Sequence, residues 1–515
     1  MTTNNKESSM TADLVKRAKQ HIQSGHTEMG ARFYRLAGEK ASKTYDFSEA
    51  LIYFDQALTW MKGEQQSEEY AVLMAREAIY QLQGSNEPRL QDLTRLETIA
   101  RRLKDDIKQT AVSIRQAQYN LDTSNYRNAI TIVQLAIRLA QLIRKESEEA
   151  KGHLVLGQAL SQQGNFDSAW IELNQALELA EAHHLKETQA NSLNALGLLF
   201  ADLGEFVRAT DYYDQALAIF QQLQHRPGLS NVLNNLGIIS HAHGRYMKAK
   251  DYWDRAHHAF DQMGNRMGQA RTLTNLGTML MDLGDYSQSQ RYHEDTLKLC
   301  QDIELVFGQC LALINLSLVY HYQNDHALAR SHSLQALELA KSMDNKRLEG
   351  YALTTLGHAQ LGLTKLEEAE DAYWQSVALW QALNVTADMI EAQAGLAAVA
   401  LQQKQVEQAH EHVIQILEYL NDGTTLDGVE SPFRVYLICY QVLQASNNMD
   451  QAKQLLQRAK TELLERMAEI VDDSLQQSFV SNVPVHRALM AEAQPQTFTQ
   501  NGATVTPTVS PVSVS

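Results

Sequence analysis

A repeat of 40 residues runs through most of this 515-residue chain and constrains its fold more than any other feature. Small residues recur at this step in a first series: Gly157, Gly197, Gly237, Gly277, Ser317, Gly357 and Ala397. Twelve residues further on comes a second series: Ala169, Ala209, Ala249, Ser289, Ala329, Ala369 and Ala409. A third series follows after seven more: Ala176, Ala216, Ala256, Thr296, Ala336, Ser376 and Ile416. Seven registers that agree at one spacing predict a single structural unit repeated along the chain.

Each unit is predicted to be a hairpin of two helices. A small residue in the first helix allows the second helix to cross closely, and a Gly-x-aromatic turn such as Gly164–Phe166 reverses the chain. Small residues seven positions apart lie on one face of the second helix. Because one hairpin cannot bury its apolar face alone, neighbours must stack into a right-handed superhelical solenoid.

The proline content supports an all-α fold. Residues 1–480 contain only Pro88, Pro227 and Pro432. Proline lacks a backbone donor and clashes with the preceding helical turn, so a chain that avoids it is nearly all helix. We expect about eleven hairpins between residues 31 and 470.

The register divides the chain into five segments. A loop at Asn421–Pro432 shifts the repeat by three residues, because Ala452 and Ala459 keep their spacing of seven at a displaced position. The expected segments are a capping helix (1–30), degenerate repeats (31–149), regular 40-residue repeats (150–429), a last repeat with a capping helix (430–490) and a disordered tail (491–515).

Charge and composition exclude several classes of protein. With 61 acidic and 45 basic side chains the net charge is −16, so nucleic acid is not expected as a partner. Three widely spaced cysteines predict buried thiols of a reducing compartment. The first residues contain no secretory signal, and no run of about 18 apolar residues predicts a membrane span. We expect a cytoplasmic protein.

The repeat resembles the tetratricopeptide repeat family. Leu196–Phe200 and Ala209–Tyr213 match the L-G-x-x-Y and A-x-x-x-F elements of that family. The period of 40 and the missing terminal proline resemble the long-period branch, which includes kinesin light chains and bacterial regulators of the MalT type. The string Asn234–Gly237 is typical of that branch. The resemblance implies a solenoid whose concave groove binds proteins or peptides.

Two end segments resemble repeat arrays of bacterial signalling ATPases and cyclases. Phe33–Ala41 is similar to the entry of such arrays, and Ser478–Arg487 is similar to their closure. By this resemblance Phe479 and Val483 cover the last hairpin, and Pro484 ends the helix. In those families the array senses or recruits a ligand for an attached module.

Catalysis has no support in the sequence. The chain lacks the GxxxxGK[ST], GxGxxG, GxSxG and HExxH strings. The histidine pairs lie one or two positions apart, so on a helix they point to different faces and cannot chelate a metal together. We expect no enzyme, no catalytic or metal-binding residues and no cofactor.

Side-chain amides on the first helices are the expected contact residues for a peptide. A carboxamide offers a donor and an acceptor and can pair with the backbone of an extended peptide. The expected peptide-binding residues are Asn191, Asn194, Asn231, Asn234, Asn235, Arg271, Asn275 and Asn315. Alternatively, the amides hydrogen-bond the adjacent hairpin and set the stacking angle.

Two functions remain open at this stage. The first is a non-catalytic scaffold that captures an extended peptide or partner segment in its concave groove. The second is a sensor array that binds a small ligand or signal peptide and controls a separately encoded ATPase, cyclase or transcription factor. The sequence does not reveal the partner, the biological process, or whether the chain self-associates.

Overall fold

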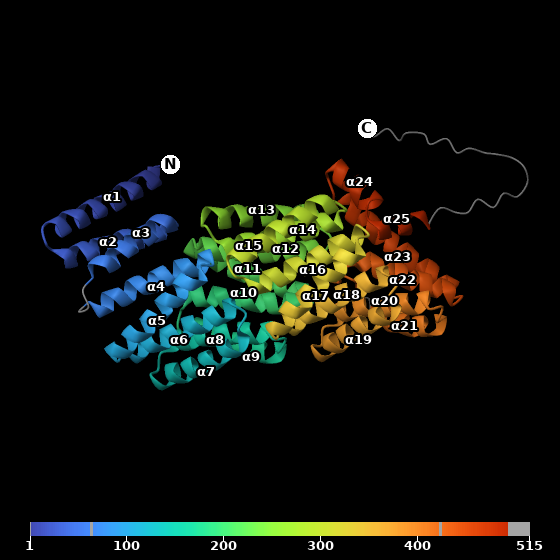
Figure 1. The fold of residues 1–515 in the computed structure, drawn as a ribbon, viewed down its shortest axis with the longest axis horizontal. Helices are drawn as coiled ribbons and strands as arrows, with labels where there is room; N and C mark the ends of the chain where they lie inside the picture. Colours follow the sequence, from blue (N-terminus) through green and yellow to red (C-terminus); the bar gives the residue numbers. More distant parts are fainter. Residues whose placement is uncertain (1, 62–64, 422–424, 493–515) are drawn as a thin grey trace, which may run out of the picture.

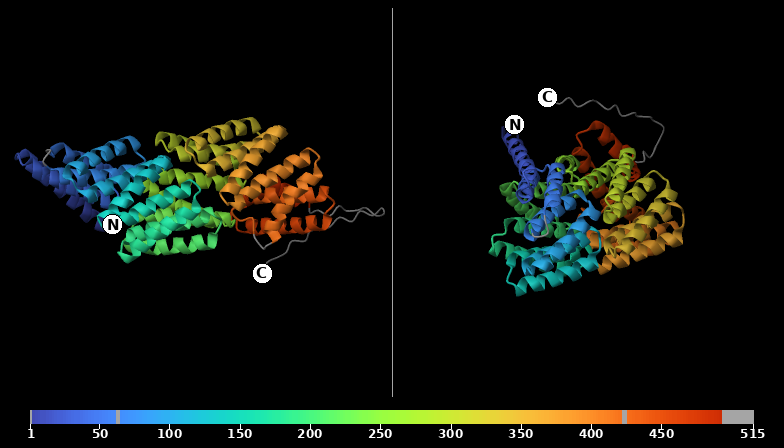
Figure 2. Two further views of the ribbon diagram at one scale, coloured as in Figure 1. Left: turned by 90° about the horizontal axis from the view of Figure 1, so that it is seen from below. Right: turned by 60° about the vertical axis from the view of Figure 1, so that its left-hand side comes forward.

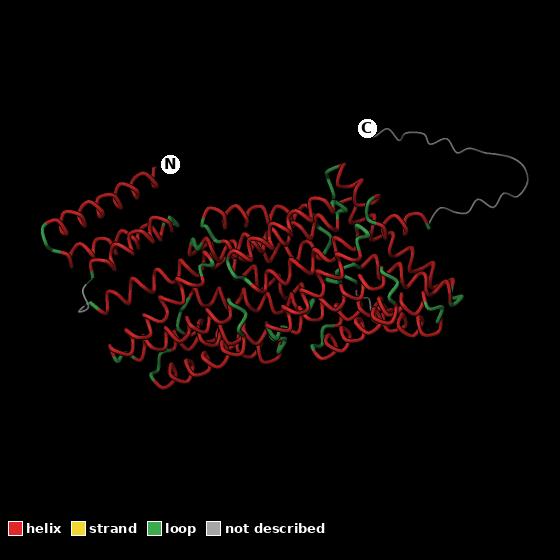
Figure 3. Tube along the Cα trace, viewed as in Figure 1, coloured by secondary structure: helices red, strands yellow, loops and turns green. Residues whose placement is uncertain are grey.

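The structure is a computed structural model that describes residues 2–61, 65–421 and 425–492. In these ranges the chain forms 25 α-helices joined by short connections, with no strand (Figures 1 and 3). The helices are α1 Thr2–Gln23, α2 Thr27–Lys43, α3 Phe47–Trp60, α4 Gln66–Gln83, α5 Asn86–Leu103, α6 Asp106–Asp122, α7 Tyr126–Leu142, α8 Glu146–Gln162, α9 Phe166–Ala182, α10 Lys186–Asp202, α11 Phe206–Leu223, α12 Arg226–Ala242, α13 Tyr246–Gln262, α14 Arg266–Asp282, α15 Tyr286–Asp302, α16 Val306–Tyr322, α17 His326–Ser342, α18 Lys346–Gly362, α19 Leu366–Ala382, α20 Thr386–Gln402, α21 Val406–Asn421, α22 Pro432–Ala445, α23 Met449–Ala468, α24 Asp473–Ser481 and α25 Pro484–Ala491. The expected disordered tail falls almost entirely on residues 493–515, which lie outside the described residues.

The helices from α2 to α23 pair into eleven hairpins, which confirms the predicted all-α solenoid. Between α6 and α21 the first helices begin at a constant step of 40 residues, for example at Glu146, Lys186 and Arg226. The molecule is elongated, with α1–α3 at one end and α22–α25 at the other (Figures 1 and 2).

In several hairpins the small residue of the first helix makes room for a large side chain of the second helix. A Cβ atom on Gly237 would lie 2.4 Å from Nε1 of Trp253, and one on Gly197 would lie 2.6 Å from the ring of Tyr213. Both rings are 1% exposed. The predicted close crossing is therefore a fit of a ring over a glycine, and both aromatic side chains belong to the core.

The turn inside each hairpin needs a left-handed backbone. Gly164 and Gly284 adopt φ of 79° and 78°, which glycine reaches without steric cost. Thr364 stands at the equivalent position with φ of 58°, a conformation that a β-branched residue rarely adopts. The fold therefore imposes the left-handed turn even where the sequence lacks the glycine.

The first helices form the concave side of the solenoid. From α6 to α22 each first helix contacts the first helices of the neighbouring hairpins, as well as its own partner helix. Elements on the concave side of a curved stack lie closer together than those on the convex side. We call the surface formed by the even-numbered helices α8 to α22 the inner face.

Consecutive turns of the superhelix touch each other. Arg127 forms an ion pair with Asp344 at 2.8 Å, and these residues are 217 positions apart. The Asn86 side chain donates to the carbonyl of Ile303 at 3.0 Å, also across 217 positions. One superhelical turn therefore takes about five and a half 40-residue units, and each turn packs against the next.

The C-terminal cap covers more than the last hairpin. Phe479 is fully buried and Val483 is 6% exposed, as predicted. The Phe479 ring lies 5.9 Å from that of Tyr246 on α13, in the preceding superhelical turn. A helix ends just before Pro484, as predicted, and Pro484 also begins the next helix. Helix α24 ends at Ser481, and Pro484 is the first residue of α25, where a missing N–H has no helical acceptor to lose.

The predicted register shift is present near the C-terminus. Helix α23 begins at Met449, 43 residues after the start of α21 at Val406, instead of 40. Between α21 and α22 the structure describes residues 425–431, which are not helical. This insertion becomes important for the inner face.

The three cysteines are buried and unpaired. Cys300, Cys310 and Cys439 are each 0% exposed. Burial raises the pKa of each thiol to about 12. The thiols therefore stay protonated at neutral pH and pack as small apolar groups, as predicted.

Candidate functional site

Four asparagine side chains form a continuous row of hydrogen bonds across three inner helices, α10, α12 and α14. Asn235 donates to the carboxamide oxygen of Asn194 at 3.0 Å, and Asn275 donates to that of Asn234 at 2.9 Å. Asn234 donates to Asn235 at 3.2 Å and joins the two pairs. We call these four residues the amide row.

The amide row gives the predicted contact residues partners within the protein. Asn234 and Asn235 are only 2% and 6% exposed, whereas Asn194 and Asn275 keep partial exposure. These hydrogen bonds are what the structural alternative expects. A carboxamide has two donor hydrogens and an oxygen with two lone pairs, so the row leaves capacity at its exposed members. Peptide contact by these residues stays a prediction.

The other predicted residues lie along the same face. Arg271 is exposed and donates to the Asn231 carboxamide at 2.7 Å, one repeat away. Asn315 is 7% exposed and donates to the Thr278 hydroxyl at 3.4 Å. Asn191 is partly exposed on α10, one helical turn before Asn194. The structure thus brings the eight residues onto the inner helices α10 to α16.

A buried charged cluster lies further along the inner face. Arg434 on α22 lies 2.8 Å from Glu391 on α20 and 3.0 Å from Nε2 of His358 on α18. His358 Nδ1 lies 2.7 Å from the hydroxyl of Tyr373 on α19. Three inner helices and one outer helix are therefore joined by a single polar network.

The charges of this cluster are fixed by burial. Burial and the neighbouring Arg434 lower the pKa of His358 to about 4, so the imidazole is neutral at pH 7. Its Nε2 accepts from Arg434, and the proton on Nδ1 is donated to Tyr373. Burial raises the pKa of Glu391, but His358 and Arg434 outweigh it and hold this pKa below its ordinary value. The cluster is thus a carboxylate–guanidinium pair beside a neutral histidine.

A second ionic contact joins two inner helices that are four repeats apart, within one superhelical turn. Arg347 on α18 lies 2.6 Å from Asp202 on α10. Next to it Tyr351 donates to Asp388 on α20 at 2.9 Å. Burial raises the pKa of Asp388 to about 6, although Arg347 and Tyr351 oppose this rise. The inner face is therefore acidic and crowded towards its C-terminal end.

Residues 425–431 fold back against the array, and we call them the strap. Leu426 is fully buried and Val429 is 6% exposed, and both belong to the same core as Leu276 of α14. Asp427 lies 3.1 Å from His243 and 3.4 Å from Arg466. The strap is thus held by the array it crosses, across 184 residues in the case of His243.

Sequence reasoning missed the charged cluster and the strap. Glu391 and Arg434 are 43 positions apart, and His358 and Arg434 are 76 apart, so no local pattern pairs them. The three-residue register shift at Asn421–Pro432 was the sequence signal that indicated an insertion in the array at this position.

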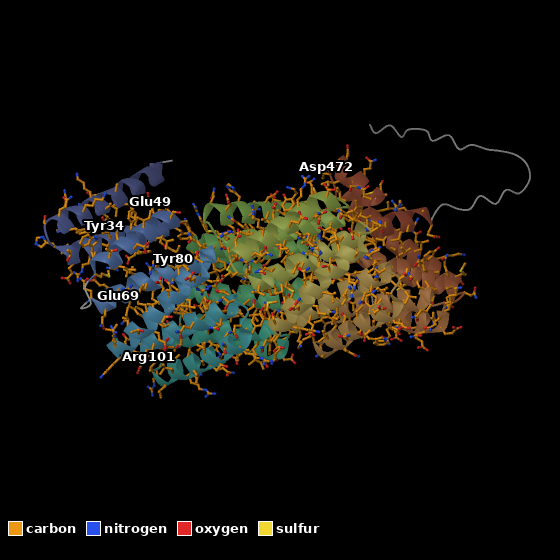
Figure 4. The ribbon with its side chains drawn as sticks, viewed as in Figure 1. Tyr34, Glu49, Glu69, Tyr80, Arg101 and Asp472 are labelled. Carbon is orange, nitrogen blue, oxygen red and sulfur yellow. The ribbon has the colours of Figure 1, made fainter. Side chains whose placement is uncertain are left out.

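Neither a metal site nor a membrane span is found in the described part of the chain. No group of three or more His, Cys, Asp or Glu residues is placed to hold a metal ion there. No helix within the described ranges combines the length and apolarity needed to cross a bilayer. A shallow cavity of about 600 Å³ lies between α4 and α5, away from the inner face, and its lining includes Glu69 (Figure 4).

Comparisons with known proteins place the repeats in one family. Sequence profiles of the tetratricopeptide repeat match residues 150–183, 188–262 and 268–342. No curated protein sequence matches the chain significantly.

One solved structure has a similar fold at low sequence identity, and two others align with lower scores. Cut9–Hcn1, a hetero-tetramer of the APC/C, aligns at a TM-score of 0.53 with 17% identity, over 84% of this chain and 76% of that one. A Rap protein complexed with competence and sporulation factor gives 0.46 at 15% identity, over 67% and 97%. Yeast Tom70 gives 0.36 at 14% identity, over 94% and 96%. The first of these alignments supports an all-α repeat solenoid.

Proposed function

We propose that this chain, whose residues 150–183, 188–262 and 268–342 match tetratricopeptide repeats, is a protein-binding scaffold that takes an extended peptide or partner segment on its inner face. The observation that carries the proposal is the amide row with its exposed flanks. Asn194, Asn275 and the Arg271–Asn231 pair stand side by side on α10, α12 and α14 and keep free hydrogen-bonding capacity. Such groups can pair with a peptide backbone without reading its side chains.

The scaffold role fits the chemistry of the rest of the molecule. His358 and Glu391 owe their shifted pKa values to burial in a network with Arg434, and the lowered pKa of His293 comes from burial alone. A structural ion-pair network perturbs pKa values without implying catalysis. We therefore assign the array to recognition and not to turnover.

The test uses peptides selected from a random display library on the purified chain. Their affinity is measured by fluorescence anisotropy for the wild type and for Asn275→Ala combined with Asn231→Ala. We expect about 30-fold weaker binding, since each of the two lost neutral hydrogen bonds costs about 1 kcal/mol. Gln215→Ala, an exposed amide on the outer helix α11, is the matched control and should bind like the wild type.

Circular dichroism must show that the variants keep their helices. Unchanged affinity in the double variant would remove the amide row from recognition and leave it a structural feature. A loss of helicity instead would assign the amides to hairpin stacking.

The alternative is a sensor array that controls a separately encoded ATPase, cyclase or transcription factor. The contacts between inner helices four repeats apart favour it, since a ligand on the inner face would have to strain or release pairs such as Arg347–Asp202. Small-angle scattering separates the two functions. A sensor changes its radius of gyration when the selected peptide binds, and a passive scaffold does not.

A further inference from the structure

The strap interrupts an otherwise regular array. Elsewhere in the regular array a first helix follows the preceding hairpin after two or three residues, as between α19 at Ala382 and α20 at Thr386. After α21 the chain instead inserts extra residues and turns them inward, so that Leu426 and Val429 are buried. Inserted loops normally lie on the surface, because buried backbone needs hydrogen-bond partners. An insertion buried in this way has the properties of a bound segment.

The strap makes a tight turn that fits the surface beneath it. The N–H of Val429 donates to the carbonyl of Leu426 at 3.1 Å, and Gly428 adopts φ of 85°. A Cβ atom on Gly428 would lie 2.8 Å from the Phe206 ring of α11. Only glycine satisfies both the backbone conformation and this close approach.

Polar contacts fix both ends of the strap to different parts of the array. Asp427 is held by His243, in the turn after α12, and by Arg466 of α23. Ser431 shares a hydrogen bond of 3.0 Å with the hydroxyl of Tyr322 on α16. Burial raises the pKa of Asp427, but the hydrogen bond from His243 and the charge of Arg466 bring it below its ordinary value. The array therefore binds the Asp427 carboxylate in its ionised form, through His243 and Arg466.

Glu430 makes the docked strap less stable than it could be. Burial, together with the carboxylates of Glu391, Asp388 and Asp282, raises the pKa of Glu430 to about 8. Because burial and like charges oppose its ionised form, Glu430 must take up a proton when the strap docks at neutral pH. The strap is thus bound through Leu426, Asp427 and Val429, and its docking costs free energy at Glu430.

We propose that the surface beneath the strap, formed around Phe206, His243, Tyr322 and Arg466, is an interaction site for short segments in which an acidic residue and a glycine lie between two apolar ones. The strap is the internal occupant of this site, and a partner segment of the same chemistry binds by displacing it. This inference rests on the proposed function, because the displacing segment belongs to a bound partner.

The experiment separates the strap from the array and adds it back in trans. Residues 425–431 are replaced by a Gly-Ser segment of the same length, and the missing segment is supplied as an acetylated, amidated peptide. We expect saturable one-to-one binding by calorimetry, about tenfold tighter to the replaced protein than to the wild type, whose strap fills the site. The same peptide with Asp427→Asn should bind about fivefold more weakly, and a scrambled peptide should not bind.

Equal affinity for the two proteins would overturn the inference. So would the absence of saturable binding to a replaced protein that keeps wild-type helicity by circular dichroism. A display-selected peptide that loses affinity on Asn275→Ala but binds the wild-type and replaced proteins equally would leave the proposed function standing and remove the strap as a competitor. If the strap peptide binds in trans while no selected peptide responds to the amide variants, the proposed function alone fails.

Discussion

Two arginines occupy the same register position at different places on the inner face, and their surroundings differ. Arg271 pairs with Asn231 one repeat earlier, across 40 positions. Arg434 pairs with Glu391 across 43 positions, which is one repeat plus the three-residue shift. Asn231 and Glu391 are themselves four repeats apart. The two pairs are therefore equivalent, with an amide exchanged for a carboxylate.

Burial gives the two pairs different consequences. Arg271 is accessible to solvent on the inner face, although its surroundings there lower its pKa by burial, whereas Arg434 is 9% and Glu391 3% exposed. An exposed pair is solvated and contributes little, but a buried pair cannot lose one member without leaving an uncompensated charge. The same repeat position therefore provides an exposed contact near the amide row and a buried ion pair that stabilises the packing of the C-terminal helices.

The largest effect is expected from removing each arginine in turn. Arg434→Ala leaves Glu391 buried and unpaired, so the free energy of unfolding should fall by about 3–5 kcal/mol. Arg271→Ala should cost about 0.5–1 kcal/mol, the value of one exposed hydrogen bond. Urea denaturation at pH 7 measures both. A small and equal loss of unfolding free energy in the two variants would show that the buried pair does not stabilise the fold.

Acid should weaken the buried network and leave the amide row unaffected. The pKa of His358 is lowered to about 4 by burial and by Arg434, below the ordinary value near 6.5. The unfolded chain therefore binds a proton that the folded chain refuses, and stability is lost as the pH falls from about 6.5 towards 4. In His358→Gln the loss of unfolding free energy between pH 7 and pH 5 should shrink by about 2 kcal/mol.

Asn235→Gln in the amide row is the comparison variant for this measurement and should keep the wild-type slope with pH. An unchanged slope in His358→Gln would mean that the imidazole is already protonated or exposed.

Raising the pH should weaken the docking of the strap. The raised pKa of Glu430 means that its contribution to stability is present below about pH 4.5 and is lost as the pH rises through about 8. The groups around it are Glu391, Asp388, Asp282 and Tyr351. Glu430→Gln should therefore be about 1–2 kcal/mol more stable than the wild type at pH 9, after allowance for its partial exposure, and nearly equal at pH 5.

Urea denaturation at the two pH values measures this difference, with the exposed Glu367→Gln of the outer helix α19 as the control. A variant less stable than the wild type at pH 9 would contradict the repulsion assigned to Glu430.

The smallest effect is expected from giving the exposed pair the residue types of the buried pair, an arginine and a carboxylate. Asn231→Asp places a carboxylate beside Arg271 and should add about 0.5 kcal/mol or less, since the pair is exposed to solvent and salt. Thermal unfolding at 10 and 300 mM NaCl should show the gain only at low salt. A gain in stability as large as the loss expected for Arg434→Ala would mean that charge alone, without burial, determines how much the pair stabilises the protein.

Much of the fold could be predicted because the repeat is local. The 40-residue step, the glycine turns and the eleven hairpins depend on residues within one unit, such as Gly237 and Trp253, which are 16 positions apart. The amides of the candidate site were recognised for the same reason. Their hydrogen bonds to one another were only one of two predicted alternatives, because a donor on one helix can serve a neighbouring helix or a peptide equally well.

The rest of the site depends on distances that no local pattern encodes. Small crossing angles accumulate over about five units before Arg127 meets Asp344 or the strap meets His243. Only that accumulated geometry decides that Arg434 is buried while the equivalent Arg271 is not. The residue types and their spacing were readable in the chain, but their exposure, and with it their energetic role, follows from how successive turns of the superhelix pack together.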